Sequence, residues 1–142
     1  KILSLNILIN KCKNISIYNF AAGNSSEKVS FLTNTVNSGG SKIAPKVKKI
    51  PYYYDFPREI SVDMKRLDDV LEPVYDIVTM DIEGSEYDVL EKMIEDDSIR
   101  LINELWIEFH PHKAKIDAIR HNTLNKYIDC LGIKVDREWN AM

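Results

Sequence analysis

Cysteine is scarce in this sequence of 142 residues, which contains only Cys12 and Cys130. The two lie far apart and in no metal-ligand pattern, so we expect reduced core thiols rather than a disulfide or a cysteine-bound metal. No apolar run approaches the roughly 18 residues that a membrane helix needs. No signal-peptide pattern follows Lys1. We therefore expect a cytoplasmic protein without a membrane segment.

Neither sign of charge dominates the sequence. Nineteen Lys and Arg residues stand against 22 Asp and Glu residues, giving a net charge of −3. This balance gives no sign of a nucleic-acid or anionic membrane partner. A hydrophobic content of 44% and a charged content of 29% are those of an ordinary globular protein. The length suits one domain over residues 1–142.

The stretch 76–88, Asp-Ile-Val-Thr-Met-Asp-Ile-Glu-Gly-Ser-Glu-Tyr-Asp, joins a short apolar run to a group of acids. The run at 77–80 is too short for a helix and rich in β-branched residues, so it predicts a buried strand of a parallel sheet. Gly84 permits a sharp turn, and Ser85 with Asp88 has the spacing of a helix capping box. Ligands of open α/β sheets bind at the carboxyl ends of strands, so this turn is either a site or a well-capped helix start.

The rest of the chain alternates between strand and helix patterns. Strands are predicted at 15–20, 27–32, 60–64, 76–80, 102–109 and 133–135, and helices at 1–12, 67–71, after Ser85 and at 116–131. This order predicts an α/β fold with a mainly parallel sheet flanked by helices, the strand at 76–80 central and the last strand near an edge. The long loop at 33–45 is functional or disordered. The three tyrosines at 52–54 have two open interpretations: they line a substrate pocket, or they serve only in packing.

Three segments carry a resemblance to a known family. They are Arg-Leu-Asp-Asp-Val-Leu at 66–71, Asp-Ile-Glu-Gly-Ser-Glu at 81–86 and Trp-Ile-Glu-Phe-His at 106–110. In this order they resemble the later half of an FkbM-type methyltransferase domain. Ala-Ala-Gly at 21–23 is similar to the segment after the family's third strand. The resemblance implies a Rossmann-like fold of the class I methyltransferase type, with S-adenosylmethionine as cofactor.

The resemblance also implies an N-terminal truncation. FkbM-type domains begin with a strand, a glycine-rich turn around the methionine part of the cofactor, and an acidic residue that binds the ribose. No glycine cluster precedes Gly23 here. We therefore expect the chain to be the C-terminal portion of such a domain, and to bind S-adenosylmethionine weakly or not at all by itself.

The candidate site residues follow the predicted strands. Methyl transfer to a hydroxyl group needs two positioned reactants and the removal of a proton. Asp81 and His110 end two strands that should be neighbours, and Glu83 lies in the turn. We expect Asp81 to border cofactor and acceptor, and Glu83 or His110 to be the general base. By the resemblance alone, Ala21 and Ala22 pass near the adenine.

Several of these residues also have purely structural interpretations. Asp88 is expected to be only a helix cap. Glu86 would organise the turn through backbone N–H groups, and a position near a helix N-terminus favours an acid whatever the function. His110, which precedes Pro111, could be a loop residue whose hydrogen bonds are made locally. His112 and His121 are expected on the surface.

The resemblance and the candidate base favour methylation of an oxygen in a sugar or another hydroxylated small molecule, and we assign no metal to this reaction. Two alternatives stay open. In the first, Asp81, Glu83, Glu108 and His110 hold a divalent metal in a hydrolase. In the second, the chain is a truncated, non-catalytic interaction module.

Overall fold

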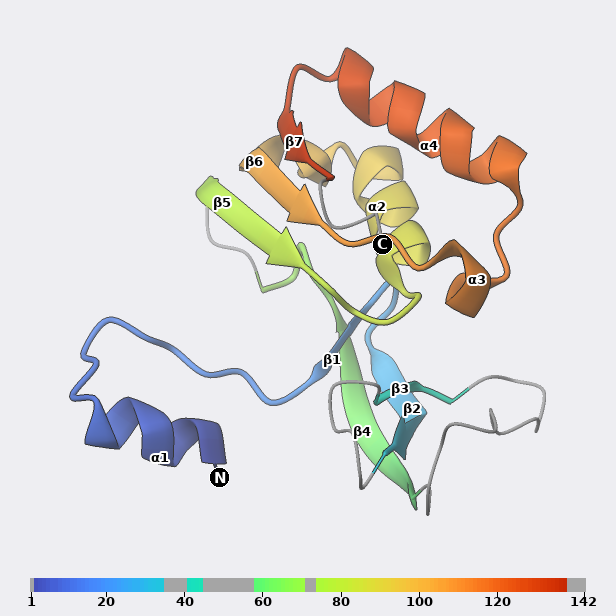
Figure 1. Ribbon diagram of the computed structural model, residues 1–142. Coiled ribbons are helices and arrows are strands. Elements are labelled where there is room, and N and C mark those ends of the chain that lie inside the picture. The colour runs from blue at the N-terminus through green and yellow to red at the C-terminus, as the bar shows by residue number, and fades with distance from the viewer. Residues whose placement is uncertain (1, 35–40, 45–57, 71–73, 138–142) are drawn as a thin grey trace.

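A computed structural model describes residues 2–34, 41–44, 58–70 and 74–137 of the chain (Figure 1). The described residues form a mixed α/β fold with two sheets, one of four strands and one of three. The part of the chain that the structure describes contains no helix long and apolar enough to cross a membrane. The three tyrosines at 52–54 and part of the predicted loop at 33–45 lie outside the described residues.

The first sheet contains β1 (Ala21–Gly23), β2 (Glu27–Thr33), β3 (Lys42–Ile43) and β4 (Arg58–Arg66). Its order is β1-β4-β2-β3, and only the β1–β4 pair is parallel. This mixed sheet does not confirm the expected Rossmann-like, mainly parallel sheet. The physical reason lies in β2 and β4, whose apolar positions alternate and face each other, as in the pairs Val29–Val62 and Phe31–Ile60. Such alternation suits an antiparallel ladder with one solvated face.

The second sheet contains β5 (Tyr75–Met80), β6 (Ile102–Ile107) and β7 (Lys134–Asp136), all parallel and in the order β5-β6-β7. The expected position of β7 at an edge is confirmed, but the expected central position of β5 is wrong. The central strand is β6. One face of this sheet leaves Ile77 51% exposed and Trp106 39% exposed. The apolar run in β5 predicted a buried strand, but only one face of this strand is buried.

The helices are α1 (Ile2–Ile9), α2 (Glu86–Glu95), the short 3-10 helix η2 (Ser98–Leu101), α3 (Pro111–Ala114) and α4 (Ala118–Cys130). Figure 1 shows α1 apart from the two sheets, and it contains no buried residue. Helices α2 and α4 pack on β5 and β6 in one core, through side chains that include Leu90, Leu105 and Ile128. This core fixes the beginning of α2 against the carboxyl ends of β5 and β6, which positions the site.

Two predicted elements are wrong. Residues 15–20 form no strand, because alternating apolar residues need a partner strand and Ile15 and Ile17 are exposed. Residues 67–70 form a turn rather than a helix. Arg66 Nε donates a hydrogen bond of 3.0 Å to Asp68 Oδ1 there. Local side-chain bonds of this kind compete with helix formation.

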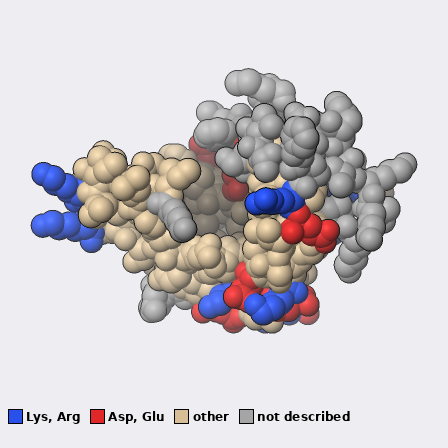
Figure 2. Space-filling model, turned by 90° about the horizontal axis from the view of Figure 1, so that it is seen from below, with Lys and Arg blue, Asp and Glu red and all other residues tan. Residues whose placement is uncertain are grey.

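The two cysteines are free, as expected, but they are not core thiols. Cys130 is exposed and Cys12 is half-buried. On the face that Figure 2 shows, basic and acidic side chains lie side by side along the lower edge. Such mixing is consistent with the small net charge of −3 and does not form a basic surface there.

Candidate functional site

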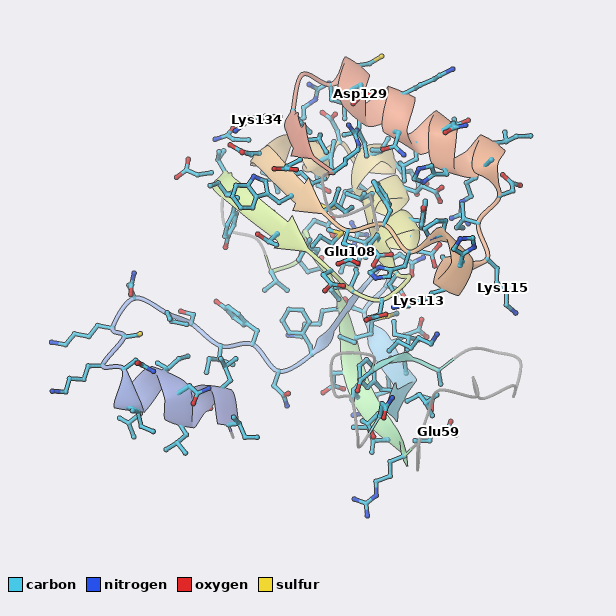
Figure 3. The ribbon with its side chains drawn as sticks, viewed as in Figure 1. Glu59, Glu108, Lys113, Lys115, Asp129 and Lys134 are labelled. Carbon is cyan, nitrogen blue, oxygen red and sulfur yellow. The ribbon has the colours of Figure 1, made fainter. Side chains whose placement is uncertain are left out.

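The parallel pairing of β5 and β6 brings the ends of the two strands together. Met80 pairs with Ile107, and the backbone N–H of Glu108 donates a hydrogen bond of 3.0 Å to the carbonyl of Met80. Asp81 and Glu108 therefore leave the sheet side by side, and His110 follows two residues later. Figure 3 labels Glu108 just past the end of β6, near the beginning of α2. The expectation that Asp81 and His110 end neighbouring strands is confirmed.

Glu86, in the first turn of α2, holds this region together from the inside. Its side chain is fully buried. Oε1 accepts hydrogen bonds from the backbone N–H of Ile82 at 3.2 Å and of Gly84 at 3.0 Å. The expected role of Glu86 in organising the turn is confirmed. Oε2 is buried and has no hydrogen-bond partner among the described residues.

The same Glu86 oxygen also lies 2.9 Å from His110 Nδ1. An ionised Glu86 accepts the proton of Nδ1, and in a neutral imidazole the lone pair then lies on Nε2. His110 Nε2 lies 3.5 Å from Glu108 Oε1 and 3.8 Å from Asp81 Oδ1. Both distances are longer than a normal hydrogen bond. The imidazole is thus fixed on one side by a buried acid and faces two further carboxylates on the other.

Glu83 lies apart from this group. Its backbone is in the left-handed region, with a φ of 58°, and its carboxylate forms an ion pair with Lys113 of α3. The acids and histidine whose ligand atoms converge are Asp81, Glu108 and His110, without Glu83. The role of Glu83 as a general base stays a prediction.

A cavity of about 220 Å³ joins the first sheet to the acidic turn. Its wall includes Ala21 and Ala22 of β1 on one side and Asp81, Glu83 and Ser85 on the other. The structure therefore brings together the alanines and the acids that the sequence predicted, although they lie far apart in the chain. A smaller cavity of about 120 Å³ lies at the strand ends, lined by residues that include Asp81 and Glu108.

The larger cavity is also lined by Lys42 of β3. Burial lowers the pKa of Lys42, and the neighbouring charge of Lys113 lowers it further, while Glu83 acts in the opposite direction. No sequence pattern indicated this residue, because β3 is only two residues long and lies in a stretch expected to be loop.

The expected capping box is wrong in its contacts. Ser85 is the N-cap of α2, but its side chain makes no capping hydrogen bond. Its ψ of −1° is helical rather than extended, which turns the hydroxyl away from the N–H groups that a cap would satisfy. Asp88 instead pairs with Arg120 of α4 at 3.0 Å.

His112 is exposed, as expected, whereas His121 is half-buried rather than fully at the surface. His121 Nδ1 lies 2.8 Å from the phenolic oxygen of Tyr87, and its ring packs edge-on against Phe109 at 5.3 Å between centroids. Burial raises the pKa of Tyr87 to about 12, with a further contribution from the charge of Glu86. A polar side chain on a helix face gives no sequence signal for such a contact.

A mixed α/β fold with acids and a histidine at the ends of parallel strands is the arrangement of an α/β enzyme that binds its ligand at that edge of the sheet. The family model of the methyltransferase FkbM domain matches residues 2–135. The chain therefore belongs to the FkbM methyltransferase family, and the resemblance carried by the three segments is confirmed. A search of the curated proteins and a search of the solved structures each gave no match.

Proposed function

We propose that the protein transfers a methyl group from S-adenosylmethionine to an oxygen of a sugar or another hydroxylated small molecule. One observation carries this proposal beyond family membership: Ala21 and Ala22 line the same cavity as Asp81. The resemblance implied that the alanines pass near the adenine, and the position of Asp81 at the end of a strand predicted that it borders cofactor and acceptor. A shared cavity is what both placements require.

The residues present fit part of the cofactor. Phe20, Phe31 and the two alanines give one wall of the cavity an apolar surface that suits a purine ring, and Asp81 supplies negative charge opposite it. Carboxylates attract the positively charged sulfonium of the cofactor. Ligand pockets usually measure roughly 300–1,000 Å³, so this cavity of about 220 Å³ suits one portion of the molecule. We assign it to the adenine and ribose end.

The bound cofactor supplies a methyl group on a sulfonium sulfur, and the thioether that remains after transfer is the leaving group. The chain then has to orient the acceptor and take up a proton. His110 is suited to this task, because Glu86 holds Nδ1–H at 2.9 Å and leaves the lone pair on Nε2. His110 would take the hydroxyl proton of the acceptor at Nε2 while the methyl group leaves the sulfonium sulfur for the acceptor oxygen, and the buried Glu86 would stabilise the resulting imidazolium. Asp81 is exposed at the same edge and orients the acceptor.

A nuclear magnetic resonance titration with S-adenosylhomocysteine tests the binding part of this proposal. Chemical shifts detect even millimolar affinity, so the expected weak binding does not prevent the measurement. We expect the amides of Ala21, Ala22 and Asp81 to shift together, while those of α4 stay in place. Ala22→Trp should fill the cavity and abolish the shifts. Shifts confined to other surfaces, or equal shifts in Ala22→Trp, would contradict the assignment of the cavity.

Acceptor chemistry needs its own measurement. The protein, incubated with methyl-labelled S-adenosylmethionine and a panel of hydroxylated compounds that includes free sugars, should label an oxygen of one class. The position of the label in the product distinguishes oxygen from nitrogen or carbon methylation. Labelling of amines alone would overturn the proposed acceptor but leave the methyltransferase assignment intact.

A further inference from the structure

The two carboxylates that face His110 have no cationic partner in the described part of the chain. Asp81 and Glu108 form no ion pair with a described lysine or arginine, and His110 is the one basic side chain among the described residues within 4.0 Å of either carboxylate. Other acids nearby are paired, as Glu83 is with Lys113 and Asp88 with Arg120. The ends of β5 and β6 thus gather negative charge that nothing described offsets.

Glu86 adds a third carboxylate to this region. It is fully buried, and one of its oxygens has no partner among the described residues. Its contact within the group is His110 Nδ1 at 2.9 Å. A single imidazole therefore stands among three acids. Burying or crowding carboxylates in this way is costly unless a positive charge is present.

The distances within the group suit a bound cation better than direct hydrogen bonds. His110 Nε2 lies 3.5 Å from Glu108 Oε1 and 3.8 Å from Asp81 Oδ1, and all three ligand atoms lie within 4.8 Å of one another. Atoms that share one ion at ~2.1 Å are themselves roughly 3.0–3.4 Å apart in tetrahedral or octahedral geometry. A small inward movement of the exposed Asp81 side chain closes the remaining difference.

The contact between Glu86 and His110 is an independent feature of metal sites. Histidine ligands usually donate their second ring N–H to a carboxylate, which fixes the tautomer and turns the other nitrogen to the metal. Here Glu86 lies outside the group of three and holds Nδ1 from the buried side. Nε2 is thereby directed at the two open carboxylates before any ion is present.

We propose that Asp81, Glu108 and His110 form a binding site for one divalent metal ion, with Glu86 as the residue that positions His110. One imidazole with two carboxylates is a mixed nitrogen and oxygen set that suits Mn²⁺, Fe²⁺ or Zn²⁺ better than Ca²⁺. The site keeps open positions, because only three protein ligands converge. These positions would accept oxygens of the acceptor molecule.

The metal site rests on the geometry of these side chains and does not depend on the proposed methyl transfer. If the metal site and the methyl transfer are both correct, Nε2 of His110 coordinates the ion. A hydroxyl group of the acceptor that binds the ion would then lose its proton more readily, because the metal lowers the pKa of that hydroxyl. His110 then acts as a ligand rather than as the base. Metal binding is measured without cofactor or acceptor, so failure of the one proposal is distinguishable from failure of the other.

Manganese titration of the full 142-residue chain tests the site directly. Electron paramagnetic resonance of MnCl₂ solutions measures free Mn²⁺, and we expect the signal to fall by one equivalent per chain. Asp81→Asn and Glu108→Gln each remove one ligand charge at a partly exposed position, so both should fold, and each should weaken binding by more than about tenfold. Glu86→Gln should weaken binding by about 10–100-fold, the usual effect of losing the group that orients a ligand.

The matched control is Asp76→Asn, which removes the same charge from the opposite end of β5. Its binding should equal that of the unaltered chain. No saturable binding of Mn²⁺ or of ZnCl₂ at millimolar concentration would overturn the proposal. Equal weakening by Asp76→Asn would also overturn it, because it would show adsorption to a negative surface. Undiminished binding by Asp81→Asn and Glu108→Gln, with their folds confirmed by circular dichroism, would overturn it as well.

Discussion

His110 Nδ1 lies 2.9 Å from Oε1 of Glu86, a carboxylate that is completely buried. This contact joins the end of β6 to the first turn of α2. The same oxygen accepts hydrogen bonds from two backbone N–H groups of the turn that follows β5. One carboxylate thus connects the turn, the helix and the imidazole, so the geometry of the candidate site and the stability of the fold depend on the same residue.

Replacing Glu86 should therefore destabilise the protein strongly. Glu86→Ala leaves two partly buried N–H groups and His110 without their acceptor, and hydrogen bonds to charged groups are worth about 1.5–3 kcal/mol each. We expect the free energy of unfolding in urea to fall by about 3 kcal/mol or more. Glu95→Gln at the other end of α2 is the control, because Glu95 is an exposed partner of Lys92. Its cost should stay within about 0.5 kcal/mol, and equal losses in both variants would contradict the role of Glu86.

Asp81 should matter for activity far more than for stability. Its side chain is 57% exposed and its one ion-pair partner among the described residues is His110. Asp81→Asn keeps the size and removes the charge, so in a form of the protein that turns over, methyl transfer should slow by more than about a hundredfold, the lower range for a positioned acid–base or electrostatic group. The melting temperature should hardly change. Turnover with labelled S-adenosylmethionine and thermal unfolding measure the two effects.

Asp88→Ala provides the control for Asp81. The sequence predicted Asp88 to be a helix cap, but the structure pairs it with Arg120 across two helices. An exposed pair of this kind contributes at most about 1 kcal/mol, and Asp88 lies outside the group around His110. Turnover per folded molecule should persist in Asp88→Ala. Normal turnover in Asp81→Asn, or lost turnover in Asp88→Ala, would remove Asp81 from its proposed role.

The sequence predicted the parts of the site that depend on neighbours in the chain. The turn at 81–85 followed from Gly84 and the acids around it, and the strand predicted at 102–109 includes Leu105 and Ile107, which are both buried. Glu86 as the acceptor for the turn followed from its position near a helix N-terminus. These features depend on local geometry, which residue types and spacing reveal.

The remaining features depend on which elements pair, and no local pattern reports this. The contact between Glu86 and His110 requires the parallel register of β5 and β6, in which Met80 faces Ile107. The edge position of β5 follows from sheet order and not from its own apolar content. The antiparallel ladder of β2 and β4 joins segments separated by more than 20 residues. The sheet order and the contact between Glu86 and His110 therefore depend on tertiary pairing, which residue spacing does not reveal.

Gly84 should be harder to replace than Gly132, although both have positive φ. Gly84 has a φ of 110°, and an added Cβ would lie 3.2 Å from the backbone nitrogen of Ala114. Gly132, after α4, has a φ of 73° and open space around the same position. Gly84→Ala combines backbone strain with a steric conflict against α3, and should cost about 2–4 kcal/mol. Gly132→Ala meets strain alone and should cost about 1 kcal/mol. Urea unfolding of the two variants measures the difference. Equal losses in the free energy of unfolding would show that α3 moves away from the added methyl group at no cost.

The pH dependence of stability should carry a contribution from Tyr87. Burial raises its pKa to about 12 in the folded protein, whereas a tyrosine of the unfolded chain titrates near about 10. A raised pKa in the folded state means that the contribution is fully present below about pH 10 and is lost as the pH rises from about 10 to about 12. Within this window the unfolded chain releases its proton first, so unfolding becomes more favourable.

Tyr87→Phe should remove this part of the alkaline loss. The variant gives up the hydrogen bond of 2.8 Å to His121, so it begins less stable at neutral pH but declines less between about pH 10 and about pH 12. The ultraviolet absorbance of tyrosinate, followed with pH, should lose the contribution of one group that titrates near pH 12 in this variant. Tyr127→Phe is the control, because Tyr127 is 51% exposed on α4, and it should keep both the late titration and the alkaline decline. An unchanged late titration in Tyr87→Phe would show that the phenol is accessible to hydroxide, and would contradict its burial beneath α4.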